Sequence, residues 1–268
     1  MSEEKIRNYM GGRADVTVFD EIDSTNEEAK RRIREGLSKP ALYLAEAQTN
    51  GRGRVGHTFY SPKYTGLYFS LAYPVPQADA SILRVTAKAA VAVVRGIQAR
   101  LNLALSIKWV NDIYVGSRKV AGILTEHVTD PEGNDFVIVG IGVNVTTAEF
   151  PDEIKDRAGS LDPGLPGFGK TDVFSPDRND IAGCIAEVLL YELDHMEETE
   201  YLDAYRAHSN VLGRQVTFSQ YNDGRTEEKT GTAITIDDSG ALIVLDKEGR
   251  RERLDSGEIR VRTWKGDL

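Results

Sequence analysis

One long stretch, Ala78–Leu101, constrains the fold of this chain most. It reads ADASILRVTAKAAVAVVRGIQARL, which is rich in alanine and apolar on a broad face, and this pattern predicts a long, packed helix. Strand-like segments lie on both sides of it: 15–20, 41–48, 66–73, 104–110, 112–115, 118–128 and 135–145. Gly116 and Ser117 predict a hairpin between two of these segments, whereas helices connect others. The main body is therefore predicted to be a mixed α/β fold.

Two further helical regions are marked by their ends. Ser24 and Glu27 have the spacing of a capping box, and Gly36 suits a helix end, so a helix is predicted between them. Pro176 after a serine predicts the start of a helix that runs to about Glu198. A shorter helix is predicted in YLDAYRAHS.

The pattern changes after about residue 210. Four short strand-like segments follow, RQVTFS, GTAITI, ALIVLD and IRVRTW, and Asp-Gly, Ser-Gly and Glu-Gly pairs separate them. Short strands punctuated in this way are typical of small β-barrels. We therefore predict two domains, a mixed α/β domain over residues 1–210 and a small barrel over residues 211–268.

Composition excludes several classes of protein. Thirty-three basic and 42 acidic residues give a net charge of −9, which opposes non-specific binding to nucleic acid. Four histidines and one cysteine show no zinc-type cluster. Cys184 allows no internal disulfide and is expected to pack in an apolar helix. No stretch reaches the roughly 18 apolar residues of a spanning helix, and MSEEKIRNYM lacks a signal-peptide core. A cytoplasmic location is predicted.

One apparent nucleotide motif is rejected. GLPGFGKT, residues 164–171, matches the phosphate-loop pattern G-x-x-x-x-G-K-[ST]. That pattern requires a buried strand before it and a helix directly after it. Neither is present, since RAGSLDP precedes it and DVFSPDR follows it. A solvated loop is predicted instead of a phosphate-loop NTPase.

A glycine- and arginine-rich stretch, GRGRVG at residues 51–56, predicts an anion site. Glycine lets backbone N–H groups approach a ligand closely, and arginine supplies planar donors for carboxylate and phosphate oxygens. Taken alone, the stretch is more typical of a flexible loop with solvated arginines than of an anion site.

A second cluster lies in KWVNDIYVGSRKVAGIL. Lys119 begins a returning strand whose next residues are small or apolar, so its side chain is placed on the floor of a pocket. Asn111 and Asp112 interrupt the preceding strand and are expected to face the same end. Alternatively, Asn111 and Asp112 are ordinary turn residues, and Lys119 is an exposed charge on a strand.

Five segments in one order are far more specific than any one of them: STN (24–26), QTNGRGRVG (48–56), KWVND (108–112), RKVAGIL (118–124) and GIGVNV (140–145). Over nearly the whole chain, this set resembles the biotin protein ligases. The resemblance implies a catalytic domain related to class II aminoacyl-tRNA synthetases, followed by an SH3-like barrel. It also implies activation of biotin with Mg-ATP to biotinyl-5′-AMP and pyrophosphate, and transfer of biotin to a lysine of a biotin carboxyl carrier domain.

The same resemblance assigns site residues. Those assigned to biotin are Ser24, Thr25, Asn26, Gln48, Gly51, Arg52, Gly53, Arg54, Lys119 and Gly122. Those assigned to ATP or the adenylate are Arg52, Arg54, Phe59, Asn111, Lys119 and Asn144. The catalytic residues are Lys119, Arg54 and Asp112, and no Mg²⁺ ligands are assigned. These residue types suit the chemistry, because hydroxyl and amide groups bind a ureido ring and cations stabilise charge on phosphate.

The chain departs from the family in three places. Val110 replaces the usual proline of KWPND, so the first strand is expected to end less sharply. Phe59 is the nearest match to a common tryptophan, with an aromatic face but no N–H donor. Only about 14 residues precede the first strand, so the winged helix of repressor members is not expected.

Two alternative functions and one expected assembly remain to be considered. Lipoate protein ligases share the fold, but their arginine loop has adjacent arginines followed by glycines, unlike GRGRVG. A DNA-binding biotin sensor is opposed by the net charge. The resemblance also makes a homodimer plausible.

Overall fold

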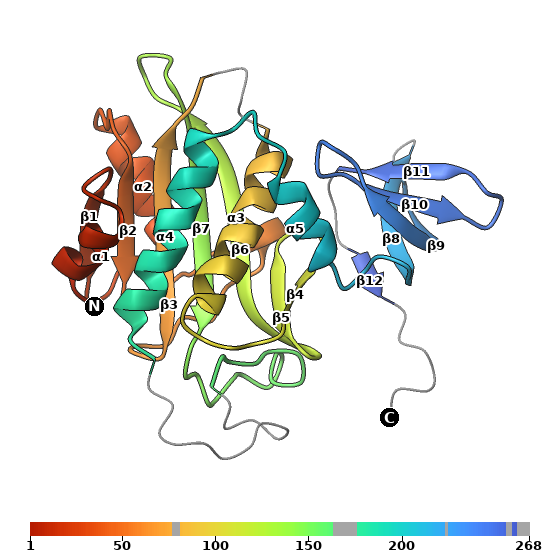
Figure 1. Ribbon diagram of the computed structural model, residues 1–268, viewed down its shortest axis with the longest axis horizontal. Coiled ribbons are helices and arrows are strands. Elements are labelled where there is room, and N and C mark those ends of the chain that lie inside the picture. Colours follow the sequence, from red (N-terminus) through yellow and green to blue (C-terminus); the bar gives the residue numbers. More distant parts are fainter. Residues whose placement is uncertain (77–80, 163–175, 223–224, 256–258, 262–268) are drawn as a thin grey trace.

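The computed structural model describes the chain except for residues 77–80, 163–175, 223–224, 256–258 and 262–268 (Figure 1). A seven-stranded sheet forms the centre, in the order β1-β2-β3-β7-β6-β5-β4. Its strands are β1 (Asp15–Phe19), β2 (Ala41–Ala45), β3 (Gly66–Pro74), β4 (Leu105–Lys108), β5 (Asp112–Val115), β6 (Arg118–Thr129) and β7 (Asp135–Asn144). The predicted mixed α/β body is confirmed.

The connections in this sheet mix helices and hairpins, as predicted. β1 and β2 run parallel, because α2 (Thr25–Arg34) links them. The other neighbouring pairs run antiparallel, and β4 to β7 follow one another through short turns. The motif segments therefore come together near the ends of β2, β5, β6 and β7.

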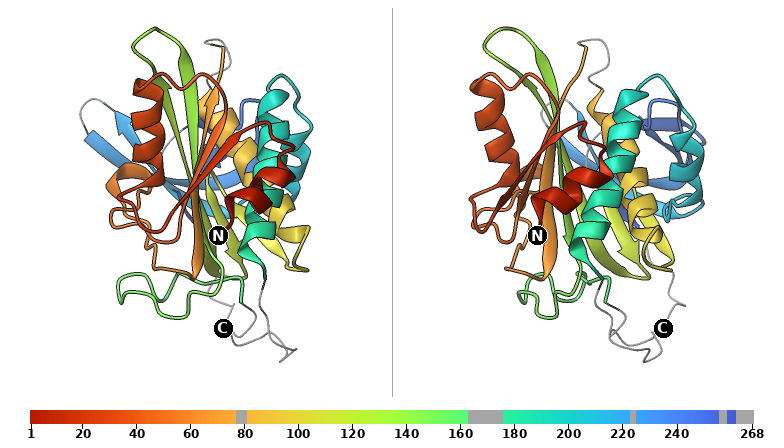
Figure 2. Two further views of the ribbon diagram at one scale, coloured as in Figure 1. Left: turned by 90° about the vertical axis from the view of Figure 1, so that its left-hand side faces the viewer. Right: turned by 60° about the vertical axis from the view of Figure 1, so that its left-hand side comes forward.

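Helices cover both faces of the sheet unequally (Figure 2). α1 (Glu3–Tyr9), α3 (Ile82–Gln98) and α4 (Arg178–Asp194) pack on one face, where α3 is buried along most of its length. α2 covers the opposite face through Ala29 and Ile33, which belong to one buried cluster with Tyr43, Phe136 and Ile138. Because α2 is short, part of that second face is left for a cavity.

Several helix ends differ from the prediction. Ser24 is the N-cap of α2, but its side chain makes no capping bond, so the predicted capping box is wrong. The Glu27 carboxylate instead pairs with Lys30 at 2.9 Å. α4 begins at Arg178, with Asp177 as its N-cap, rather than at Pro176. The long predicted helix begins at Ile82, and α1 was not predicted at all.

A second, five-stranded antiparallel sheet follows α5 (Tyr201–Ala207), in the order β11-β10-β9-β8-β12 (Figure 1). Its strands are β8 (Gln215–Asn222), β9 (Arg225–Ile236), β10 (Leu242–Asp246), β11 (Arg251–Leu254) and β12 (Ile259–Val261). It contacts the main body directly, since Trp109 Nε1 donates a hydrogen bond to the Gly240 carbonyl at 3.0 Å. Arg206 Nε likewise donates to the Ile236 carbonyl at 2.8 Å.

Two sequence expectations concern burial and membranes. Cys184 is buried in α4, as expected. Within the described ranges, no helix combines the length and apolar character needed to cross a membrane. The rejected phosphate-loop motif, including Lys170, lies outside the described residues.

Candidate active site

A cavity of about 670 Å³ lies on the face of the central sheet that α2 covers only in part. The predicted site residues that line it are Ser24, Thr25, Asn26, Gln48, Arg52, Gly53, Arg54, Phe59, Asn111, Asp112, Lys119, Gly122 and Asn144. Gly51 does not line it, because this residue is packed against the Phe59 carbonyl and Ser61. The structure thus brings together segments that lie more than 100 residues apart in the sequence.

The floor of the cavity is made by glycines of β6 and β7. A Cβ added to Gly142 would lie 2.5 Å from the Phe59 ring, and one added to Gly140 would lie 2.0 Å from Asn26 Oδ1. Any larger residue at these positions would displace the side chain above it. The Phe59 ring also packs edge-to-face on Tyr68, with centroids 6.3 Å apart. Phe59 is therefore a fixed aromatic wall.

Lys119 reaches the floor because of a β-bulge. Ile113 of β5 pairs with Ala121 of β6, but the next residue, Tyr114, pairs with Lys119, so Val120 is an extra residue in β6. The bulge shifts the alternation of side chains. Lys119 Nζ consequently lies 3.2 Å from the position that a Cβ on Gly122 would occupy. Without the bulge, Lys119 would face the opposite side of the sheet.

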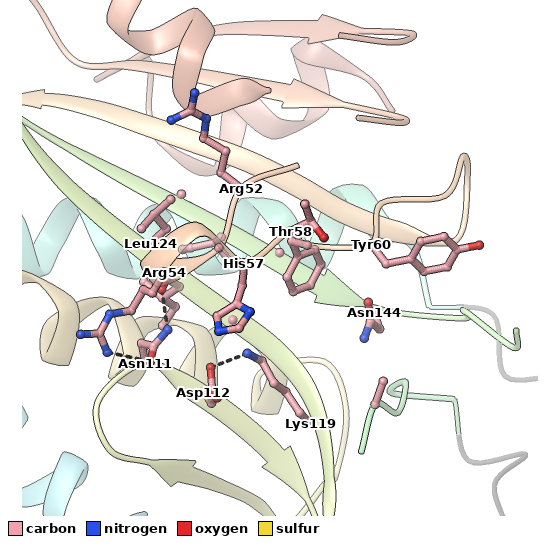
Figure 3. A pocket seen from close by; sticks show the side chains of 18 of the residues that line it. Arg52, Arg54, His57, Thr58, Tyr60, Asn111, Asp112, Lys119, Leu124 and Asn144 are labelled. Atoms are coloured by element: carbon pink, nitrogen blue, oxygen red, sulfur yellow. Dashed lines mark hydrogen bonds and ion pairs between the residues drawn. The ribbon is translucent and has the colours of Figure 1, made fainter. Parts of the chain in front are cut away.

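Two polar pairs define one end of the cavity, which we name the charged end (Figure 3). Lys119 Nζ forms an ion pair with Asp112 Oδ1 at 2.5 Å. Arg54 Nη1 donates to Asn111 Oδ1 at 3.3 Å, and Asn111 Nδ2 donates to the Ile123 carbonyl at 2.9 Å. Arg54 and Lys119 thus each contact one member of the Asn111-Asp112 pair, which places two cationic side chains at this end of the cavity.

The two loop arginines diverge, although their spacing suggested one shared anion. Arg54 belongs to the short helix η1 (Arg54–Gly56) and turns toward Asn111. Arg52 points away from that end (Figure 3), and its Nη1 pairs with Glu27 Oε1 of α2 at 3.2 Å. In this structure Arg54 and Lys119 form the cationic group, whereas Arg52 is tied to α2.

Uncharged polar side chains of Ser24, Thr25, Asn26 and Gln48 line another part of the cavity, which we name the polar end. Gln48 Oε1 accepts hydrogen bonds from the backbone N–H of Thr25 at 2.9 Å and from Thr25 Oγ1 at 3.2 Å. Gln48 Nε2 donates to Ser61 Oγ at 3.0 Å. Ser24 and Asn26 complete this end and are buried. Such groups suit a neutral, polar ligand head rather than a second charge.

Asn144 has one satisfied and one free polar atom. Its Nδ2 donates to the Gly159 carbonyl at 2.9 Å. Its Oδ1 is buried and has no hydrogen-bond partner among the described residues. A buried acceptor without a partner is costly, so a ligand hydroxyl or amino group reaching it would be favoured.

Sequence reasoning missed one wall of the cavity. Residues of the loop after β7 line it, namely Phe150, Glu153, Ile154, Arg157 and Ala158, together with His57, Tyr60 and Tyr114. The backbone holds this loop, since Lys119 N donates to the Arg157 carbonyl at 2.8 Å. No periodicity or spacing marks these residues, because the contact exists only after β6 and the loop have packed together.

The expectation for Val110 is wrong. β4 ends at Lys108 and β5 begins at Asp112, so the strand ends within a tight turn even without proline. Trp109 and Val110 are buried in that turn, and Tyr205 Oη donates to the Val110 carbonyl at 2.9 Å. Packing against α5 thus fixes the turn that presents Asn111 and Asp112.

Two family profiles match the chain. The "Biotin/lipoate A/B protein ligase family" matches residues 18–144, and the "Biotin protein ligase C terminal domain" matches residues 211–262. The first match contains most of the residues that line the cavity.

Named relatives agree with these profiles. The chain is 33% identical to the biotin–[acetyl-CoA-carboxylase] ligase of Paracoccus denitrificans, over 85% of this chain and 93% of that protein. It is 32% identical to the bifunctional ligase/repressor BirA of Bacillus subtilis, over 93% of this chain and 76% of that protein. A solved structure of a biotin protein ligase from Aquifex aeolicus in complex with biotin and ATP is similar, with a TM-score of 0.71 and 27% identity. The match covers 92% of this chain and 98% of that chain. The chain belongs to the biotin protein ligase family.

Proposed function

We propose that this protein activates biotin with ATP and then transfers biotin to a lysine of a biotin carboxyl carrier domain. The observation that carries the proposal is the cavity itself, with Thr25 and Gln48 at its polar end and Lys119 and Arg54 at its charged end. A ureido ring fits the first set and a carboxylate fits the second. The lipoate alternative is not favoured, because the relatives described above are named for biotin.

In the first step, a biotin carboxylate oxygen attacks the α-phosphorus of ATP. The new P–O bond gives biotinyl-5′-AMP, and the bond to the β-phosphate breaks to release pyrophosphate. Carboxylate and phosphate repel each other, so Lys119 and Arg54 lower the barrier by supplying positive charge where they meet. Arg52 is proposed to join this group only by leaving Glu27, and Asn144 Oδ1 and Phe59 are proposed to contact the nucleotide.

ATP is proposed to enter as its Mg²⁺ complex. In the ranges that the structure describes, no group of three or more His, Cys, Asp or Glu side chains could hold a metal ion. Magnesium commonly keeps substrate phosphates and water as ligands, with one or two carboxylates. Asp112 and Glu153 are the carboxylates that line the cavity.

In the second step, the carrier lysine attacks the carbonyl carbon of the adenylate. The C–N bond forms, AMP leaves, and the amine loses a proton. Asp112 is proposed to orient this amine or accept its proton, because its carboxylate lies at the charged end beside Lys119.

Asp112→Asn tests that role. The variant is expected to slow transfer to the carrier by about tenfold or more, because an amide cannot accept the proton, while adenylate formation changes less. Pyrophosphate release and single-turnover transfer from preformed biotinyl-5′-AMP measure the two steps separately. A defect confined to adenylate formation would sink the assignment.

Arg54→Ala tests whether the loop retains the intermediate. Arg54 is held over the charged end by Asn111, so its removal is expected to raise the off-rate of biotinyl-5′-AMP by about tenfold. Stopped-flow displacement of the bound adenylate measures this rate. If the off-rate stays unchanged, Arg54 is a binding group for the substrates and not part of a closing loop.

The overall activity is tested most directly by incubating the protein with biotin, Mg-ATP and a carrier domain. Intact-mass analysis should show one added biotinyl group on a single lysine. A carrier that remains unmodified, with no pyrophosphate released, would refute the proposed function.

Other features of the proposal follow the family resemblance. We propose that residues 1–210 form the catalytic domain and residues 211–268 an accessory domain, in line with the second profile match. A homodimer and a cytoplasmic location are proposed, and no DNA binding, since the net charge is −9. Analytical ultracentrifugation would test the homodimer, and a gel shift at several salt concentrations would test the absence of DNA binding.

A further inference from the structure

The loop of residues 150–158, which we name the wall loop, is attached to the start of β6. Lys119 N donates to the Arg157 carbonyl at 2.8 Å, and Gly159 N donates to the Lys119 carbonyl at 2.9 Å. Arg118 Nη1 donates to the Lys155 carbonyl of the same loop. A Cβ added to Gly159 would lie 2.6 Å from Arg118 Cβ, so the close approach depends on glycine. The backbone of the wall loop is therefore fixed directly beside Lys119.

Arg157 is a cation of the wall loop that lines the cavity. Its guanidinium is exposed and has no hydrogen-bond or ion-pair partner among the residues that the structure describes. Arg54, in contrast, is hydrogen-bonded to Asn111. Lys119 is ion-paired with Asp112. Unlike these two cations, Arg157 can bind an anion without first leaving a partner within the described part of the chain.

Tyr114 of β5 shows where the charge of Arg157 acts. Burial raises the pKa of Tyr114 to about 12, and the negative charge of Asp112 adds to that shift. The positive charge of Arg157 opposes it, so the guanidinium influences a hydroxyl close to the charged end. Tyr114 and Asp112 both line the cavity. The electrostatics and the backbone contacts thus agree that Arg157 lies next to the charged end.

The place where the wall loop meets β6 indicates which part of ATP it faces. Glu126 of β6 holds Asn26 of the polar end at 2.8 Å, whereas the wall loop meets the first two residues of the strand, Arg118 and Lys119. A ligand with its ring at the polar end and its carboxylate near Lys119 therefore has the wall loop ahead of the carboxylate. In phosphoryl-type displacements the attacking and leaving oxygens are roughly in line through phosphorus. The pyrophosphate would then leave on the side of the wall loop.

We propose that Arg157 binds the β- and γ-phosphates of ATP and stabilises the pyrophosphate as it leaves. The inference rests on the proposed function, because it takes biotin and ATP as the substrates. As the carboxylate oxygen bonds to the α-phosphorus, the bond from that phosphorus to the bridging oxygen breaks, and its electron pair goes to the pyrophosphate. Arg54 and Lys119 face the carboxylate and the α-phosphate, so the charge on the leaving group needs a further donor. A guanidinium supplies planar, charge-assisted hydrogen bonds to phosphate oxygens.

Arg157→Ala is expected to raise the KM for ATP about tenfold, because a charge-assisted contact with phosphate is lost, while the KM for biotin stays within about twofold. Arg157→Lys should recover part of the loss, since it keeps the charge but not the fork of donors. Pyrophosphate release at varied ATP and at varied biotin measures both constants. Lys155→Ala is the matched control, because Lys155 is an exposed cation of the wall loop that pairs with Asp152 and does not line the cavity.

The reverse reaction isolates the leaving group. Bound biotinyl-5′-AMP and added pyrophosphate should form ATP and biotin, and Arg157→Ala should raise the KM for pyrophosphate about tenfold. The off-rate of biotinyl-5′-AMP should stay within about twofold, since the adenylate no longer carries the phosphates that Arg157 binds. This pair of measurements separates contact with pyrophosphate from contact with the rest of the nucleotide.

Several results would overturn the inference. A faster off-rate of biotinyl-5′-AMP with an unchanged KM for pyrophosphate would assign Arg157 to the adenosine or the α-phosphate. A change confined to the KM for the carrier domain would make Arg157 part of a protein-docking surface. If the constants for ATP and pyrophosphate equal those of Lys155→Ala, Arg157 is a solvated surface residue. Thermal denaturation checks the fold, and Arg157→Gln replaces the alanine variant if that variant unfolds. If the unmodified protein releases no pyrophosphate with biotin and ATP, the proposed function itself fails.

Discussion

Lys119→Ala is expected to slow the formation of biotinyl-5′-AMP by about two decades, which corresponds to ~3 kcal/mol of transition-state stabilisation. Lys119 Nζ is one of two cations at the charged end, and negative charge grows there as the carboxylate attacks the α-phosphorus. The loss should appear mainly in kcat, since the interaction strengthens in the transition state. Single-turnover pyrophosphate release with saturating biotin and ATP measures it.

The fold of this variant should be intact. The backbone of Lys119 is held independently of its side chain, because its N–H donates to the Arg157 carbonyl and its carbonyl accepts from Gly159 N at 2.9 Å. Lys39→Ala is the control, since Lys39 is an exposed residue that pairs with Asp15 and does not line the cavity. Near-normal pyrophosphate release by Lys119→Ala would overturn the catalytic assignment.

The second large effect is expected on stability rather than on catalysis. Lys88 of α3 is fully buried and forms an ion pair with Glu192 of α4 at 3.2 Å. Lys88 Nζ also donates to the His195 carbonyl at 2.9 Å and lies 4.4 Å from the centre of the Tyr201 ring. Burial lowers the pKa of Lys88, and Glu192 opposes that shift. Two helices that cover the sheet are thus joined by one buried pair.

Glu192→Ala is expected to lower the free energy of unfolding by about 3–5 kcal/mol, because it leaves the Lys88 ammonium buried without its counter-charge. Lys88→Met should cost much less, since Glu192 keeps its ion pair with Arg95 at 3.0 Å. Glu187→Ala, at an exposed position of the same helix, should change the free energy by less than about 0.5 kcal/mol. Urea denaturation of the three variants measures these values. Equal losses for Glu192→Ala and Glu187→Ala would contradict the argument.

The sequence predicted the elements better than the contacts between them. Apolar periodicity located the strands of the central sheet and the long helix, because those patterns are local. The capping box failed because Glu27 has stronger partners than a backbone N–H, namely Lys30 and Arg52. Arg52 belongs to a distant segment of the chain, so the competition arises only in the folded protein.

In the candidate site, too, local motifs were predicted better than the contacts between segments. Short motifs identified Lys119 as a cavity residue, but strict alternation along β6 would have turned it away from Gly122, and the bulge at Val120 that corrects this has no sequence signal. Ser70 and Glu126 carried no motif at all. Their contacts with Asn26 depend on β3, β6 and α2 packing together, which no single segment encodes.

β6 also has a consequence for ligand size. It carries Lys119 near one end and Glu126 near the other, seven residues apart, or about 23 Å along a strand. β6 pairs with β5 over residues 118–122 and with β7 over residues 121–129, so the distance between Lys119 and the part of β6 that holds Asn26 through Glu126 is fixed. The paired backbone therefore fixes the separation between the polar end and the charged end of the cavity. An acid whose chain is longer or shorter would be excluded, because its carboxylate would be misplaced even where its ring fits.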